Sequence, residues 1–167
     1  MRNLSARPGL ILAILYVLVF GVAGCSRRGS SPNRGGDGDF DCDATCEADV
    51  RSHAVSAGRL QVNEAQWQAA FAAGKAELAN DPQWLELIAE MNQLICPIIA
   101  HTADRQKVQD LEQRIGQRTT DDLLAPPNVG NATKAGDSPE VDAARAKVVK
   151  IHLIRYIFYR QRHSCPH

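Results

Sequence analysis

The sequence predicts an all-α domain over residues 41–167: a small bundle of four to five helices, stapled by disulfides. Beyond Asp41 the apolar residues recur at three- and four-residue intervals almost throughout, and no run alternates as a strand does. Helix-capping residues, followed by proline or by a capping-box glutamine, divide this pattern into segments. The stretch also holds four cysteines, an even number that suits two disulfides.

The first two predicted helices each follow a good N-cap. The first begins after Asp43 and ends near Gly58, and its apolar face is Cys46, Val50 and Ala54. The second begins after Asn63, which Gln66 completes as a capping box. Its apolar stripe is Trp67, Phe71, Gly74 and Leu78. Gly74 in this stripe would let a neighbouring helix approach closely.

The third predicted helix is the most apolar. Asp81 serves as its N-cap and Pro82 as its first residue, where the missing N–H of proline costs nothing. Its stripe is Trp84, Ile88, Met91, Ile95 and Ile98, widened by Leu87 and Leu94. Pro97 lacks a backbone donor and clashes with the preceding turn, so the helix should kink or stop near Cys96.

A fourth predicted helix follows a cap at Thr102 or Asp104 and must end before Pro126. Its narrower stripe is Val108, Leu111 and Ile115. The sequence leaves open whether the third and fourth helices form a hairpin or one bent rod. Residues 125–137, rich in Pro, Gly and Asn, are predicted to be a loop.

The last predicted helix is the longest, beginning at the cap and proline pair Ser138-Pro139 and running to about His163. It carries two apolar stripes. One is Val141, Ala144, Val148, Ile151, Ile154 and Phe158; the other is Val149, Leu153 and Tyr156. A helix that is apolar on two sides is usually central. The alternative is that Val149, Leu153 and Tyr156 form the face that binds a partner protein.

Between residues 143 and 163 this helix also carries six basic residues and no acidic one. They are Arg145, Lys147, Lys150, Arg155, Arg160 and Arg162. Cations near the C-terminal end of a helix suit its macrodipole, which accounts for part of this bias. The other interpretation is a basic strip that faces anionic lipid or an acidic partner.

Residues 1–24 have the layout of a signal peptide. Arg2 and Arg7 precede an uncharged apolar run over residues 10–22. This run is shorter than the ~18 residues that a transmembrane helix needs, so a permanent span is the weaker interpretation.

The quartet Val22-Ala23-Gly24-Cys25 resembles the lipobox of bacterial lipoproteins. The resemblance implies that the chain is cut between Gly24 and Cys25. It also implies that Cys25 carries two or three acyl chains, enough for stable anchoring in the lipid bilayer. In Gram-negative lipoproteins, an aspartate directly after the acylated cysteine retains the protein at the inner membrane. Here that position is Ser26, so the resemblance implies that the protein is located at the periplasmic face of the outer membrane in a Gram-negative cell. The resemblance covers the export signal and no part of the folded domain.

Residues 25–40 are expected to be the lipidated N-terminus and a flexible tether, since Gly, Ser, Pro and Arg dominate them. The fifteen residues that follow Cys25 span roughly 20 Å as such a coil, so the domain should lie close to its bilayer. Without Arg2 and Arg7 the mature chain has 17 basic and 19 acidic residues, and this balance does not favour nucleic acid.

Four cysteines remain after Cys25, and in an exported protein they are expected to form two disulfides. If the helices alternate in direction, Cys96 and Cys165 lie at the same end of the bundle. That arrangement favours Cys96 with Cys165 and leaves Cys42 with Cys46. It fails if the third and fourth helices are one bent rod.

No residue pattern indicates catalysis, a metal site or a cofactor. The chain has no phosphate-binding glycine loop and no nucleophile or zinc-protease motif, so we expect it not to be an enzyme. Glu86 and Glu90 are one helical turn apart on a face predicted to be solvated, and Cys165 is better used in a disulfide than as a metal ligand. We therefore expect a protein-binding or assembly factor of the cell envelope, such as a secretion or conjugation accessory. The alternative is a periplasmic lipoprotein that binds a small molecule or a metal.

Overall fold

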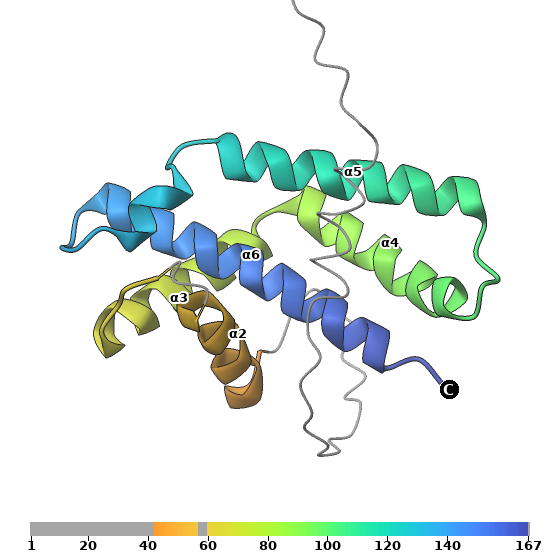
Figure 1. The fold of residues 1–167 in the computed structure, drawn as a ribbon, viewed down its shortest axis with the longest axis horizontal. Coiled ribbons are helices and arrows are strands. Elements are labelled where there is room, and N and C mark those ends of the chain that lie inside the picture. Colours follow the sequence, from red (N-terminus) through yellow and green to blue (C-terminus); the bar gives the residue numbers. More distant parts are fainter. Residues whose placement is uncertain (1–41, 57–59, 167) are drawn as a thin grey trace, which may run out of the picture.

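The computed structural model describes residues 42–56 and 60–166, which form five α-helices and one short 3-10 helix (Figure 1). In chain order these are α2 (Ala44–Ser56), α3 (Glu64–Ala79), α4 (Pro82–Ile99), α5 (Arg105–Leu124), η1 (Val129–Thr133) and α6 (Pro139–His163). The described residues contain no strand. The all-α prediction is therefore confirmed, and η1 adds one helical turn to the predicted loop.

The helices begin at the predicted caps. The side chain of Asn63 accepts a hydrogen bond from the backbone N–H of Gln66, and the side chain of Gln66 accepts one from the backbone N–H of Asn63, both at 2.9 Å. Asp81 accepts from the backbone N–H of Trp84 at 3.1 Å, with Pro82 as the first helical residue. Comparable caps are made by Asp43, Asp104 and Ser138. Each cap satisfies a backbone donor that the helix cannot satisfy itself.

The central helix of the bundle is α6. It packs most extensively on α3 and also contacts α2, α4 and η1, whereas α5 packs against α4. Figure 1 shows α6 running through the middle of the molecule, with α2 on one side and the α4–α5 pair on the other. Most residues of both apolar stripes of α6 are buried. The prediction that the last helix is central is therefore confirmed.

The α4 and α5 helices form a hairpin, which settles the alternative that the sequence left open. Helix α4 continues past Pro97 to Ile99, and the chain then turns through His101, whose φ of 55° is left-handed. The carbonyl oxygen of Pro97 accepts hydrogen bonds from the backbone N–H groups of Thr102 and Ala103, at 2.9 and 3.1 Å. Helix α5 then returns alongside α4 (Figure 1).

Helices α3 and α6 approach closely at Gly74, as predicted. A Cβ atom added at Gly74 would lie 2.8 Å from the carbonyl oxygen of Ala146 and 2.9 Å from Cγ1 of Val149. Such distances are shorter than van der Waals contact, so only glycine fits here without a shift of α6. This contact is one reason that the α3–α6 interface is the largest in the domain.

Both predicted disulfides are present. Cys42 is bonded to Cys46 at the start of α2, and Cys96 near the end of α4 is bonded to Cys165 just beyond α6. The second bond joins chain positions 69 residues apart and confirms that the ends of α4 and α6 lie together. No helix in the part of the chain that the structure describes combines the length and apolar character needed to cross a bilayer.

Candidate functional site

Three of the six basic residues of α6 are buried and paired, so they do not belong to an exposed basic strip. Arg145 is 1% exposed, and its guanidinium contacts the carboxylates of Asp137 and Asp142 at 3.1 and 3.0 Å. Lys147 and Lys150 are 8% and 7% exposed. The interpretation of α6 as one continuous basic face is wrong for this half of the helix, because its cations bind groups inside the domain.

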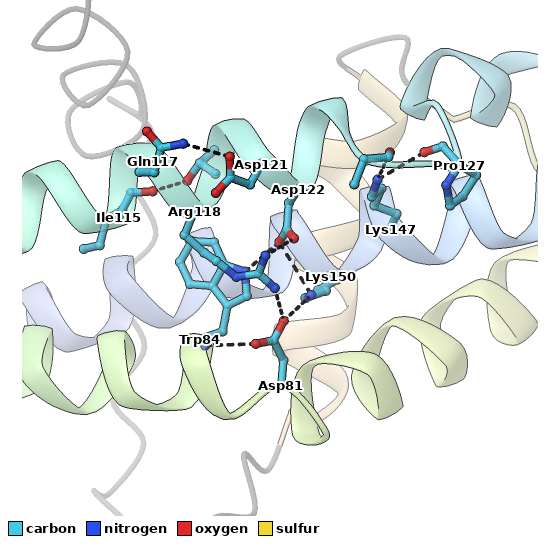
Figure 2. Close-up of polar contacts among 12 residues, drawn as sticks. Asp81, Trp84, Ile115, Gln117, Arg118, Asp121, Asp122, Pro127, Lys147 and Lys150 are labelled. Carbon is cyan, nitrogen blue, oxygen red and sulfur yellow. Dashed lines mark hydrogen bonds and ion pairs between the residues drawn. The ribbon is translucent and has the colours of Figure 1, made fainter.

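Lys150 belongs to a charge cluster, defined here as Asp81, Arg118, Asp122 and Lys150, where α4, α5 and α6 meet (Figure 2). Asp81 Oδ2 lies 2.6 Å from Arg118 Nη2 and 2.7 Å from Lys150 Nζ. Asp122 lies 2.8 Å from Arg118 and 3.5 Å from Lys150. The indole N–H of Trp84 also donates to Asp122, at 2.6 Å. Two carboxylates are therefore balanced by two cations.

The surroundings of Asp81 in the charge cluster favour its ionised state. Burial alone would raise the pKa of Asp81, but hydrogen bonds from Lys150, the backbone N–H of Trp84 and Arg118 outweigh it, so the pKa lies below its ordinary value. A carboxylate held in this way is a poor general base, because its charge is already stabilised. The charge cluster is therefore suited to tying the three helices together and not to proton transfer.

Lys147 has a different role, because its ammonium group holds a loop. It donates hydrogen bonds to the carbonyl oxygens of Ala125 and Pro127, the second at 3.1 Å (Figure 2). Burial lowers its pKa, while the nearby carboxylates of Asp122 and Glu77 act in the opposite direction. Because one ammonium group binds two backbone carbonyl groups, it fixes the path of the chain where α5 ends.

The fixed segment displays an apolar corner, defined here as Leu123, Leu124, Ala125 and Pro126. Leu124 is 79% exposed and Leu123 is 38% exposed, and Ala125 and Pro126 are also exposed. Consecutive exposed apolar residues in a rigid segment mark protein interaction sites more often than single exposed residues do. The apolar corner is therefore the candidate binding surface of the domain.

The sequence-predicted partner face is a different set of residues, and the structure corrects it. Val149 and Leu153 are fully buried and Tyr156 is 9% exposed, because α2, α3 and α4 surround α6. The apolar corner was missed, although the sequence holds its signal. Leu123 and Leu124 are adjacent apolar residues immediately before Ala125 and two prolines, so both cannot face the core of one helix.

The other predicted site residues are placed as follows. Cys25 and Gly24, the predicted lipidation and cleavage positions, lie outside the described residues. Cys96 and Cys165 are bonded to each other, so neither is a free thiol. Glu90 contacts Arg114, and Glu86 is exposed, as expected of a solvated face.

Two further features bear on ligand binding. Within residues 42–56 and 60–166, no three His, Cys, Asp or Glu side chains are grouped so that they could hold a metal ion. A hollow open to solvent follows the outer face of α2. Its described lining consists of Ala44, Glu47, Ala48, Arg51, Ser52, Val55 and Ser56. These side chains belong to a single helix and enclose no buried polar group.

Comparison of the chain with known protein families, with curated proteins and with solved structures gives no match.

Proposed function

We propose that this chain is a lipid-anchored protein of the bacterial cell envelope that binds another envelope protein, as an assembly or positioning factor of a secretion or conjugation apparatus. The lipobox-like quartet that ends at Cys25 supports the anchor. The two disulfides support export, because disulfides persist in oxidising compartments. Export and anchoring together put the folded domain beside envelope proteins.

The observation that carries the binding function is the apolar corner. Leu124 exposes 79% of its surface, yet the segment after it is fixed by Lys147. A rigid surface loses less conformational entropy on binding than a flexible one. An apolar surface of this kind fits a hydrophobic pocket or groove on a partner protein.

A photo-crosslinking experiment in cells tests this function. A photoreactive phenylalanine analogue is placed at Leu124 and, as the matched control, at the exposed Gln113 on the same helix. We expect one discrete crosslinked protein from position 124 and none from position 113. Crosslinks to many proteins at both positions, or none at either, would contradict a specific partner.

A matched pair of surface variants makes the test quantitative. Leu124→Ser should abolish recovery of the crosslinked partner, whereas Val55→Ser should leave it unchanged, because Val55 is also exposed, at 43%, but lies on α2. Both substitutions should change the free energy of unfolding by no more than about 0.5 kcal/mol, since exposed side chains make few contacts. Equal losses of the partner in both variants would count against the apolar corner.

The anchor has its own test. We expect radiolabelled palmitate to be incorporated into the wild-type chain and not into Cys25→Ala, which should accumulate uncleaved. Incorporation into the variant would show that Cys25 is not the acylated residue, independently of whether the apolar corner binds a partner.

A further inference from the structure

The remaining basic residues of α6 lie in its C-terminal half, and two further basic residues lie in the first turn of α5. The Cys96–Cys165 bond brings the ends of α4 and α6 together, and the turn after α4 leads directly into α5. We define the cationic end of the molecule as Arg105 and Lys107 on α5 with Arg155 and Arg160 on α6. Arg155 is half-buried, and the other three are exposed.

These four side chains differ from most other cations of the domain in having no carboxylate partner. Arg51, Arg114, Arg118, Arg145 and Lys150 each contact a carboxylate. Within residues 42–56 and 60–166, no member of the cationic end does so. The nearest acidic residues along the chain are Asp104 and Asp110, and residues 143–167 contain none. An anionic surface would therefore not have to displace an internal ion pair.

The α6 part of the cationic end also lies near the start of α2, where the described chain begins. Cys42 is bonded to Cys46 at the start of α2, and α2 packs on α6. Burial raises the pKa of Tyr156. The positive charge of Arg160 lowers this pKa and the negative charge of Asp43 raises it, so both charges lie close enough to act on the Tyr156 hydroxyl. Cys42, the first described residue, therefore lies near the C-terminal half of α6.

An aromatic side chain completes this surface. Tyr159 is 41% exposed, and its ring lies 4.3 Å from the ring of His163, centroid to centroid. Tyrosine has an apolar ring and a polar tip, a combination that suits the boundary between headgroups and acyl chains. Lipid headgroups are thus a better match for this surface than a purely ionic partner.

We propose that the cationic end binds anionic phospholipid headgroups, so that the domain lies against the bilayer that carries its anchor. The inference rests on the proposed export and anchoring, which put such a bilayer within reach. The carboxylates of α2 oppose it in part, but each has a contact within the domain: Asp43 with the N–H of Cys46, Glu47 with Trp67, and Asp49 with His53. These carboxylates restrict the contact with headgroups to the α6 side of the molecule and keep it away from α2.

This orientation has a consequence for the proposed function. Lys147, which holds the apolar corner, and Arg160 are thirteen positions apart on α6, which corresponds to about 20 Å along the helix. Docking through the cationic end would therefore leave the apolar corner away from the headgroups and accessible to a protein.

Vesicle binding by the non-acylated mature chain tests the proposal. Residues 25–167 carrying Cys25→Ser contain the whole described domain and cannot be held by acyl chains. We expect this protein to sediment with vesicles in which about a third of the phosphatidylcholine is replaced by phosphatidylglycerol. It should not sediment with phosphatidylcholine alone, and added salt should release it.

Two double variants with the same net charge locate the binding surface. Arg105→Gln with Arg160→Gln should lower the partition constant by about 25-fold, at roughly fivefold for each cation removed near the surface. Lys75→Gln with Lys134→Gln removes two cations from α3 and from the loop before α6 and should change binding less than twofold. Circular dichroism should show that all four substitutions leave the helices intact.

The outcomes separate this inference from the proposed anchor. Equal losses in both double variants would overturn it, because attraction by net charge alone would explain them. Absence of binding to the anionic vesicles would also overturn it, even if Cys25 of the wild-type chain incorporates palmitate. Binding that the first pair abolishes and the second retains would establish the contact, whether or not acylation is observed.

Discussion

Lys150 in the middle of α6 and Asp81 at the start of α4 are hydrogen-bonded at 2.7 Å and lie 69 positions apart, the same separation as Cys96 and Cys165. The chain therefore covers equal lengths from Asp81 to Cys96 and from Lys150 to Cys165, about 22 Å at the rise of a helix. It follows that α4 and α6 run in the same direction. An ion pair joins them at one end and a disulfide at the other, so the α4–α5 hairpin is attached to α6 at two points.

Asp81→Asn should strongly destabilise the domain. Asparagine is a good N-cap, so the start of α4 is retained, but Arg118 and Lys150 then share the charge of Asp122 alone. Removing one partner from a buried ion pair costs about 3 kcal/mol or more, because it leaves a cation uncompensated. Urea denaturation followed by circular dichroism at neutral pH measures this loss.

The matched control is Asp104→Asn. Asp104 caps α5 in the same way but is exposed and belongs to no ion pair with a described cation. We expect the free energy of unfolding to change by less than about 1 kcal/mol. Similar losses in both variants would show that capping, and not the charge cluster, is the contribution of Asp81.

The stability of the domain should fall in acid, partly through Asp81. Its pKa in the folded chain lies below the ordinary value of about 3.9, so the folded state binds this proton less readily than the unfolded state. The resulting stabilisation is complete above about pH 4 and is lost as pH falls through the folded pKa. The urea midpoint of the wild type should therefore decline more steeply below pH 4 than that of Asp81→Asn. Parallel declines would contradict the depressed pKa.

The parts of the fold that the sequence predicted well depend on residues close together in the chain. Asn63 and Gln66, or Ser138 and Pro139, act within one helical turn, so residue type and spacing are enough to locate a helix start. Connectivity needed one more step. The pairing of Cys96 with Cys165 followed from alternating helix directions, and its confirmation depends on the hairpin after Pro97.

The burial of charges on α6 could not be predicted in the same way. Lys150 pairs with Asp81, which lies 69 positions away, and Lys147 binds two backbone carbonyls that lie 20 and 22 positions away. The residue types alone do not show whether a lysine faces water or a distant carboxylate. The same limit applied to Val149, because its apolar stripe fits a partner face and a buried core equally well until the neighbours of α6 are known.

The two disulfides should contribute unequally to stability. In the chain-entropy model the Cys96–Cys165 bond closes a loop of 69 positions and is worth about 4 kcal/mol, whereas the Cys42–Cys46 bond closes four positions and is worth about 2 kcal/mol. Alanine replacement of each pair, followed by denaturant titration, measures the two losses. A greater loss from the Cys42 and Cys46 pair would show that local packing at α2 outweighs the constraint on the hairpin.

Gly74→Ala tests the close approach of α3 and α6 by the sign of the change in the free energy of unfolding. In a helix interior without close neighbours, alanine in place of glycine stabilises by roughly 0.5–1 kcal/mol. Here the added methyl group would lie 2.8 Å from the carbonyl oxygen of Ala146 and 2.9 Å from Val149, so α3 and α6 must separate. We expect a net loss of about 2 kcal/mol, typical of overpacking in a rigid core. A thermal melt that shows increased stability would mean that α3 can move away from α6 at little cost, and that their close approach at Gly74 does not determine the packing of the bundle.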